Sequence, residues 1–126
     1  MKKIVATNKA PAAIGPYSQA VQAGNFLYVS GQIPIDPETG QLVTGAIEDQ
    51  AKRVMENVKA LVESAGYTMR DVVKTLIFAT SMDYFTPVNG VYAQYFQEEP
   101  PARAFIVVKE LPKGALLEVD AIAWKA

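Results

Sequence analysis

The sequence contains no cysteine and no histidine among its 126 residues. Without cysteine, the chain has no disulfide bonds, thiolate metal ligands or thiol-based redox motifs. The absence of histidine removes the usual proton shuttle of enzymes and the commonest ligand for transition metals, so we expect no metal site. Any chemistry must therefore depend on carboxylates, tyrosines, hydroxyls, backbone groups and water.

The sequence also lacks long apolar runs and an excess of charge of either sign. Its apolar runs are far shorter than the roughly 20 residues that cross a membrane, and the N-terminal segment 1–7 has no apolar core of signal-peptide length. The net charge of −1 does not provide the basic surface that binders of nucleic acid or anionic membranes present. We therefore expect a cytoplasmic protein whose partners are neither nucleic acid nor membrane.

The rest of the composition is that of an ordinary globular protein, with 50% hydrophobic and 20% charged residues. The chain shows no linker, repeat or low-complexity segment, and its length is typical of one domain. We therefore expect a single domain that spans residues 1–126.

Hydrophobic periodicity and turn residues predict about six strands and two helices. The pair Gly24-Asn25 tolerates the positive φ of a tight hairpin turn, and apolar residues between 45 and 65 recur at helical spacing before Gly66. In chain order, the expected elements are a strand at 2–6, a hairpin of 18–23 and 26–29, a helix at 45–65, a strand at 72–80, a helix at 86–97, and strands at 103–108 and 116–124.

Two helices can cover only one face of a sheet of this size, so the pattern predicts an α+β fold with two layers. The strand at 103–108 carries almost nothing polar on either face, which indicates burial on both sides. The sequence therefore predicts an oligomer whose sheets face one another.

Arg103 is the first candidate for a functional residue, because it leads into this apolar strand. A guanidinium group stays protonated in proteins and needs an anion to face, either from the chain or from a carboxylate or phosphate ligand.

Glu118 and Asp120 share one face of the last strand. If the last two strands pair through the turn at 112–114, one of these carboxylates can approach Arg103. Such a carboxylate would form either a structural ion pair with Arg103 or a general base beside an arginine that binds the substrate anion. Alternatively, both carboxylates are simply solvated charges at an edge of the sheet.

Four weaker candidates lie elsewhere in the sequence. Ser30 and Gly31 end a strand, where a glycine lets the backbone approach a ligand closely, although a plain turn is equally compatible. Tyr17 either covers a pocket or packs within its loop. Asn89 lies among apolar neighbours in the second predicted helix, where it faces solvent, a helix contact or a ligand.

Several segments match one known family in register over nearly the whole chain. They are Ala13–Ala20, Ser30–Pro34, Val58–Gly66, Val88–Tyr92, Pro101–Arg103 and Leu111–Val119. Together they resemble the reactive-intermediate deaminase RidA (YjgF) family. The resemblance implies a chorismate-mutase-like α+β subunit and a homotrimer with active sites in clefts between subunits. It also implies hydrolysis of 2-iminobutanoate and 2-iminopropanoate, or their enamine tautomers, to 2-oxoacids and ammonia without a cofactor.

The same resemblance implies roles for individual residues. Arg103 would grip the substrate carboxylate through its bidentate fork. Glu118 would hold and polarise the attacking water with the backbone carbonyl of Phe105, and Gly31 would offer backbone contacts to the substrate. The cleft would be lined by Tyr17, Ser30 and Asn89.

The sequence departs from the family pattern around this arginine. Phe105 stands where a small residue is common, Val107 where a glutamate is common, and Pro100 where an aromatic or other residue often precedes the motif. The bulk at position 105 is expected to narrow the pocket and to alter which iminoacids fit. Two alternatives to a deaminase stay open, a non-catalytic trimeric binder of small carboxylates such as 2-oxoacids and a ribonuclease. The lack of histidine and of a basic surface disfavours the ribonuclease.

Overall fold

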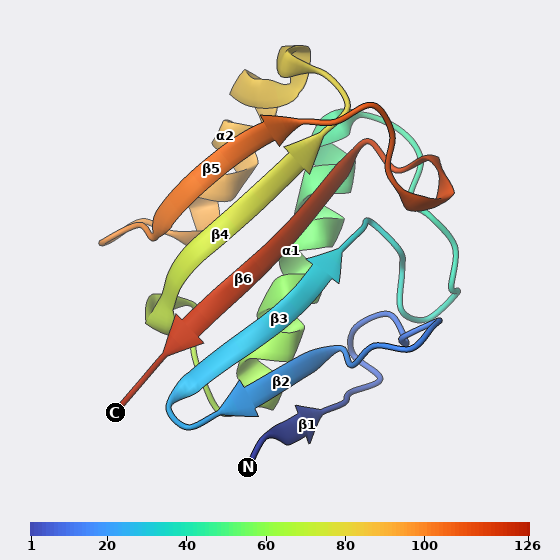
Figure 1. The fold of residues 1–126 in the computed structure, drawn as a ribbon. Coiled ribbons are helices and arrows are strands. Elements are labelled where there is room, and N and C mark those ends of the chain that lie inside the picture. The colour runs from blue at the N-terminus through green and yellow to red at the C-terminus, as the bar shows by residue number, and fades with distance from the viewer.

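A computed structural model of the chain describes all 126 residues and contains two layers, a six-stranded sheet and two α-helices that cover one of its faces (Figure 1). The strands are β1 (Lys3–Val5), β2 (Ala20–Ala23), β3 (Phe26–Gln32), β4 (Val72–Ala79), β5 (Ala102–Val107) and β6 (Leu117–Trp124), and the helices are α1 (Ile47–Ser64) and α2 (Phe85–Tyr92). Short 3₁₀ turns occur at Met69–Asp71, Met82–Tyr84, Ala93–Tyr95 and Pro112–Gly114. The predicted two-layer α+β fold is confirmed.

The strands follow the order β1-β2-β3-β6-β4-β5 across the sheet. Every neighbouring pair is antiparallel except β4 and β5, which run parallel. A parallel pair needs a crossover connection, and α2 supplies it on the helical face. As a result, β6 lies in the interior of the sheet and β5 forms an edge.

The strongest local signals of the sequence appear where they were expected. Gly24 adopts a φ of 58° in the turn between β2 and β3, and Gly66 adopts a φ of 85° just after α1 ends. The left-handed region favours glycine at both positions because a side chain is strained there.

The second helix is shorter than predicted. It ends at Tyr92, and the next three residues form a 3₁₀ turn in place of the α-helix expected to reach residue 97. Such tightening of a last turn is common because the terminal carbonyls lack α-helical partners. Phe96 still reaches the core, where its ring centroid lies 4.8 Å from that of Tyr92.

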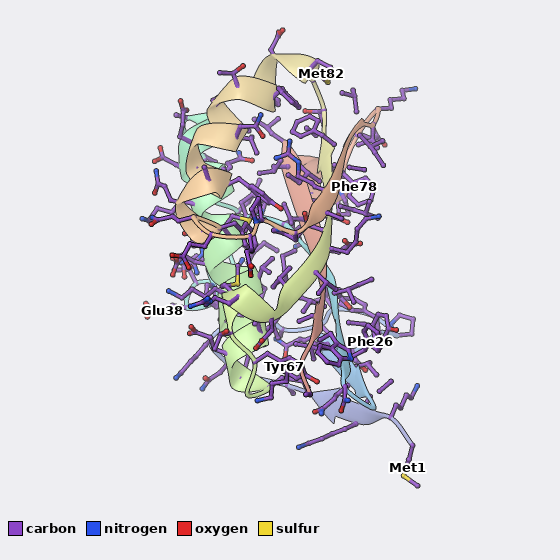
Figure 2. The ribbon with its side chains drawn as sticks, turned by 90° about the vertical axis from the view of Figure 1, so that its left-hand side faces the viewer. Met1, Phe26, Glu38, Tyr67, Phe78 and Met82 are labelled. Carbon is purple, nitrogen blue, oxygen red and sulfur yellow. The ribbon has the colours of Figure 1, made fainter.

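The core lies between the helices and the sheet, whereas the other face of the sheet is open. Figure 2, which views the sheet from its side, shows the helices on one face and Phe26 and Phe78 projecting from the other. Four large apolar side chains of β3, β5 and β6 on this open face are 40–46% exposed, and they are Phe26, Tyr28, Ile106 and Trp124. This is the face that the predicted oligomer would cover.

Candidate functional site

A cavity of about 510 Å³ lies where three segments meet. They are the N-terminal loop between β1 and β2 (residues 6–19), the end of β3 and the start of β6. Tyr17 lines it from the loop, Gly31 from β3, Lys113 from the 3₁₀ turn and Glu118 from β6. The fold therefore brings together three of the residues that the sequence singled out, Tyr17, Gly31 and Glu118.

Gly31 leaves the space that the carboxyl group of Glu118 occupies. A β-carbon at position 31 would overlap Oε2 of Glu118 and would lie 2.8 Å from its Cδ and 3.2 Å from its Cγ. Gly31 is not among the glycines with positive φ, so close packing between β3 and β6, not a turn, requires glycine here. The plain-turn interpretation of this position is wrong, because β3 continues through it to Gln32.

Glu118 is half-buried, and no cation of the chain forms an ion pair with it. Burial raises the pKa of Glu118 above its ordinary value, and the nearby Asp120 carboxylate raises it further. Burial also raises the pKa of Asp120, but the N–H of Leu76, which donates to Asp120 Oδ1 at 3.1 Å, and the charge of Lys74 oppose that shift. Asp120 is thus engaged by the sheet, whereas Glu118 opens into the cavity with a raised proton affinity, as a general base requires.

The interpretation of these carboxylates as solvated edge charges is wrong. Both lie on β6, which has β3 on one side and β4 on the other, and neither is fully exposed.

Hydrogen bonds from the start of the sheet hold the N-terminal loop beside this cavity. Gln19 is buried, and its Nε2 donates to the carbonyls of Thr7 and Pro11 at 3.0 and 2.8 Å. The hydroxyl of Ser30 donates to the carbonyl of Ser18 at 2.6 Å. Ser30 does not line the cavity, so its observed contact is with the loop that carries Tyr17.

Two buried amides of α1 hold segments on and next to the cavity wall. Asn57 Nδ2 donates to the carbonyls of Ile33 and Ile35 at 3.2 and 3.0 Å, and Gln50 Oε1 accepts the N–H of Leu116 at 3.2 Å. Neither residue was among the candidates predicted from the sequence. Their signal was available, because an asparagine and a glutamine on the apolar stripe of a helix need partners when they are buried.

Arg103 lies apart from this cavity, beside α2. Its Nη1 donates to Asn89 Oδ1 at 2.7 Å, and its Cζ lies 5.7 Å from the ring centroid of Phe85 and 5.0 Å from that of Tyr92. No acidic side chain forms an ion pair with Arg103. Asn89 is therefore a hydrogen-bond partner of Arg103, and the guanidinium keeps further N–H donors for an anion from outside the chain.

The expected approach of Arg103 to a carboxylate of the last strand does not occur. Strand β4 lies between β5 and β6, so the last two strands do not pair. Thr75 of β4 pairs with Arg103 on one side and with Ala121 on the other, which places these three side chains on the helical face. Phe78 pairs with Glu118, which places Glu118 on the open face. Within one chain, Arg103 and Glu118 thus lie on opposite faces of the sheet.

A second cavity of about 330 Å³ opens beside Arg103 and is also lined by Asn89, Tyr92 and Pro100. Phe105 shares the helical face with Arg103 and packs edge-to-face on Phe85, with 5.1 Å between the ring centroids. The bulky residue at 105 therefore adds to an aromatic wall next to the arginine.

Comparison with known protein families matches residues 7–125 to the family described as Endoribonuclease L-PSP. A RutC family protein of Pyrococcus horikoshii is 52% identical over 125 residues, which cover 99% of each chain. The 2-iminobutanoate/2-iminopropanoate deaminase of Mus musculus is 46% identical over 123 residues, which cover 98% of this chain and 91% of the mouse protein. The chain belongs to the RidA/L-PSP family.

Solved structures of RidA/L-PSP proteins match the fold closely. A putative endoribonuclease from Thermotoga maritima is 57% identical and superposes with a TM-score of 0.98, and the match covers 100% of this chain and 99% of the Thermotoga chain. Escherichia coli TdcF, solved with bound serine, is 42% identical and superposes with a TM-score of 0.95, and the match covers 98% of this chain and 99% of the TdcF chain. Neither helix of the present chain is long and apolar enough to cross a membrane.

Proposed function

We propose that this RidA/L-PSP protein hydrolyses 2-iminobutanoate and 2-iminopropanoate, or their enamine tautomers, to 2-oxoacids and ammonia. The observation that carries the proposal is the environment of Glu118. Its carboxylate opens into a cavity beside Gly31 and Tyr17, has a raised pKa, and forms no ion pair. The mammalian relatives named for this activity support it. The reaction suits the residues present, because an imine carbon is already electrophilic and needs only a positioned water and a base.

In the proposed reaction, Arg103 binds the substrate carboxylate and Glu118 acts on water. Glu118 takes a proton from the water as the water oxygen bonds to C2 of the protonated imine, and it returns this proton to the amino nitrogen, which becomes an ammonium group. The C–N bond then breaks and ammonia leaves, while the new hydroxyl loses its proton to the Glu118 carboxylate and becomes the carbonyl of the 2-oxoacid. Glu118 passes this last proton to the departing ammonia and is a carboxylate again. Backbone groups of Gly31 and Phe105 would orient the substrate and the water, and Tyr17 and Asn89 would line the cleft.

The opposite placement of Arg103 and Glu118 argues that one chain does not complete this site. Because the two side chains project from opposite faces of the sheet, a substrate that contacts both must sit between two copies of the chain. We therefore propose a homotrimer with sites between subunits, in which the open apolar face of the sheet is buried. A stable monomer in sedimentation experiments at micromolar concentration would contradict both the trimer and the composite site.

The central experiment compares wild type with Glu118→Gln. The enzyme is coupled to threonine dehydratase, and the rate of loss of the enamine and imine is measured together with the affinity for 2-oxobutanoate. Glutamine keeps the shape of the side chain but cannot accept a proton from water, so we expect the rate to fall by a factor on the order of 10² to 10⁴. The affinity should change little, because Arg103 and Gly31 would provide most of the contacts with the product.

The same measurements separate the alternatives. A non-catalytic binder of small carboxylates is the alternative that the serine bound to TdcF supports. Such a protein would bind 2-oxobutanoate but would not accelerate imine loss even as wild type. A ribonuclease would cleave RNA but would not accelerate imine loss. If wild type accelerates imine hydrolysis and Glu118→Gln does so equally well, the mechanism proposed for Glu118 is wrong.

A further inference from the structure

One side of α2 forms a support for Arg103. Phe85, Asn89 and Tyr92 follow one another at spacings of four and three residues, so they lie on the same side of the helix. All three contact the guanidinium, Asn89 by its hydrogen bond and the two aromatic residues by their rings. We infer that Tyr92 is a positioning residue that fixes the guanidinium plane of Arg103 for an incoming carboxylate. This inference rests on the proposed function, in which Arg103 binds the substrate.

Tyr92 is itself firmly held. Its hydroxyl is 2.7 Å from the hydroxyl of Thr75, a fully buried residue of β4 that pairs with Arg103 in the sheet. Its ring also packs on that of Phe96. Tyr92 therefore links the strand next to Arg103 to the helix above it, and its ring has little freedom to move away from the guanidinium.

The phenol of Tyr92 interacts with Arg103 as a neutral ring. Burial raises the pKa of Tyr92 above its ordinary value, although the hydrogen bond to Thr75 and the charge of Arg103 oppose that shift. The hydroxyl thus stays protonated at neutral pH, and the attraction is between a cation and the face of an aromatic ring.

This arrangement suits the binding of a carboxylate. A guanidinium group donates its hydrogen bonds in its own plane, and a cation–π contact offers these donors no oxygen acceptor. Within the chain, Asn89 is the hydrogen-bond acceptor that Arg103 uses. The remaining donors are held in a fixed plane, so less freedom is lost when two of them meet the oxygens of a carboxylate.

The first test measures positioning without a ligand. In protein labelled with ¹⁵N-arginine, the rotation of the Arg103 guanidinium is followed by NMR, with assignment by Arg103→Lys. We expect Tyr92→Leu to speed up this rotation at least about tenfold relative to wild type. Tyr95→Leu is the matched control. Like Tyr92, Tyr95 makes a hydrogen bond through its hydroxyl, which donates to Oε2 of Glu56 in α1 at 2.6 Å, but Tyr95 does not contact Arg103. It should leave the rotation unchanged.

The second test measures the affinity for 2-oxobutanoate in variants that keep the shape of the ring. Phenylalanine at position 92 keeps the ring face, so Tyr92→Phe should bind within about threefold of wild type. 3,5-Difluorophenylalanine at the same position withdraws electron density from the face and should bind more weakly than phenylalanine. Tyr92→Leu should bind about tenfold more weakly than wild type, within the roughly 2- to 30-fold range of a cation–π contact.

These outcomes separate the inference from the proposed function. If wild type neither binds 2-oxobutanoate nor hydrolyses the imine, the proposed function fails, and the rotation of the guanidinium alone decides whether Tyr92 positions it. If Tyr92→Leu rotates like Tyr95→Leu, the inference is wrong. If Tyr92→Leu does not fold, the fluorinated variant decides, because a purely structural role for Tyr92 would give equal affinities for the fluorinated and unfluorinated rings.

Discussion

Replacing Gly31 with alanine should displace the Glu118 carboxylate while leaving the fold intact. The new β-carbon would lie 2.8 Å from Cδ of Glu118, whereas carbon atoms in contact are normally about 3.5–4.0 Å apart. The carboxyl group must therefore move by about 1 Å. In an active site a displacement of this size costs on the order of 10² in rate. We expect kcat for imine hydrolysis to fall about 100-fold in Gly31→Ala.

The fold should survive because the clashing atoms lie at the end of a flexible side chain that opens into a cavity. The matched control is Gly90→Ala, since a β-carbon on Gly90 in α2 would meet nothing within 4 Å. Alanine in a helix is more stable than glycine by about 0.5–1 kcal/mol, so this control should be fully active and slightly more stable. The assay follows imine loss after threonine dehydratase, and thermal unfolding reports stability.

A double-mutant comparison tests the reasoning further. If alanine at 31 acts by moving Glu118, then Glu118→Gln should cost much less in the Gly31→Ala background than in wild type, because the carboxylate is already out of place. Additive losses would refute this coupling. If kcat of Gly31→Ala stays within threefold of wild type, catalysis does not depend on the position of the Glu118 carboxylate next to Gly31, and the reasoning is refuted.

Three further predictions concern Arg103, the pair Glu118 and Asp120, and Asn57. Arg103→Lys should lose most activity while its circular dichroism stays that of wild type, because lysine keeps the charge but not the two-point grip; near-normal deamination would contradict the carboxylate clamp. A general base works only when deprotonated, so kcat/KM should fall as the pH drops through the raised pKa of Glu118. Asp120→Asn removes a charge that raises this pKa and should shift the acid limb of the pH profile to lower pH; an unshifted limb would show that the two groups are not coupled. Asn57→Leu leaves two carbonyls of the 33–35 loop without their donor and should lower the free energy of unfolding by about 2–4 kcal/mol; a loss under about 1 kcal/mol in urea unfolding would contradict this role.

Local patterns in the sequence were enough to predict the individual elements and the placement of both helices on one face of the sheet. The turn at Gly24 and the end of α1 before Gly66 depend on backbone conformations that glycine adopts with little strain, and these signals are local. Helical periodicity marked α1 for the same reason, because an apolar stripe is a property of neighbouring residues. The two helices were also enough to predict that one face of the sheet stays open.

The order of the strands, and with it the geometry of the candidate site, could be read only from the folded chain. The sequence allowed β5 and β6 to pair through the turn between them, but β4 pairs with both and separates them. Strand order depends on contacts between residues far apart in the chain, which no local pattern encodes. This order places Arg103 against α2 and Glu118 against Gly31, on opposite faces of the sheet.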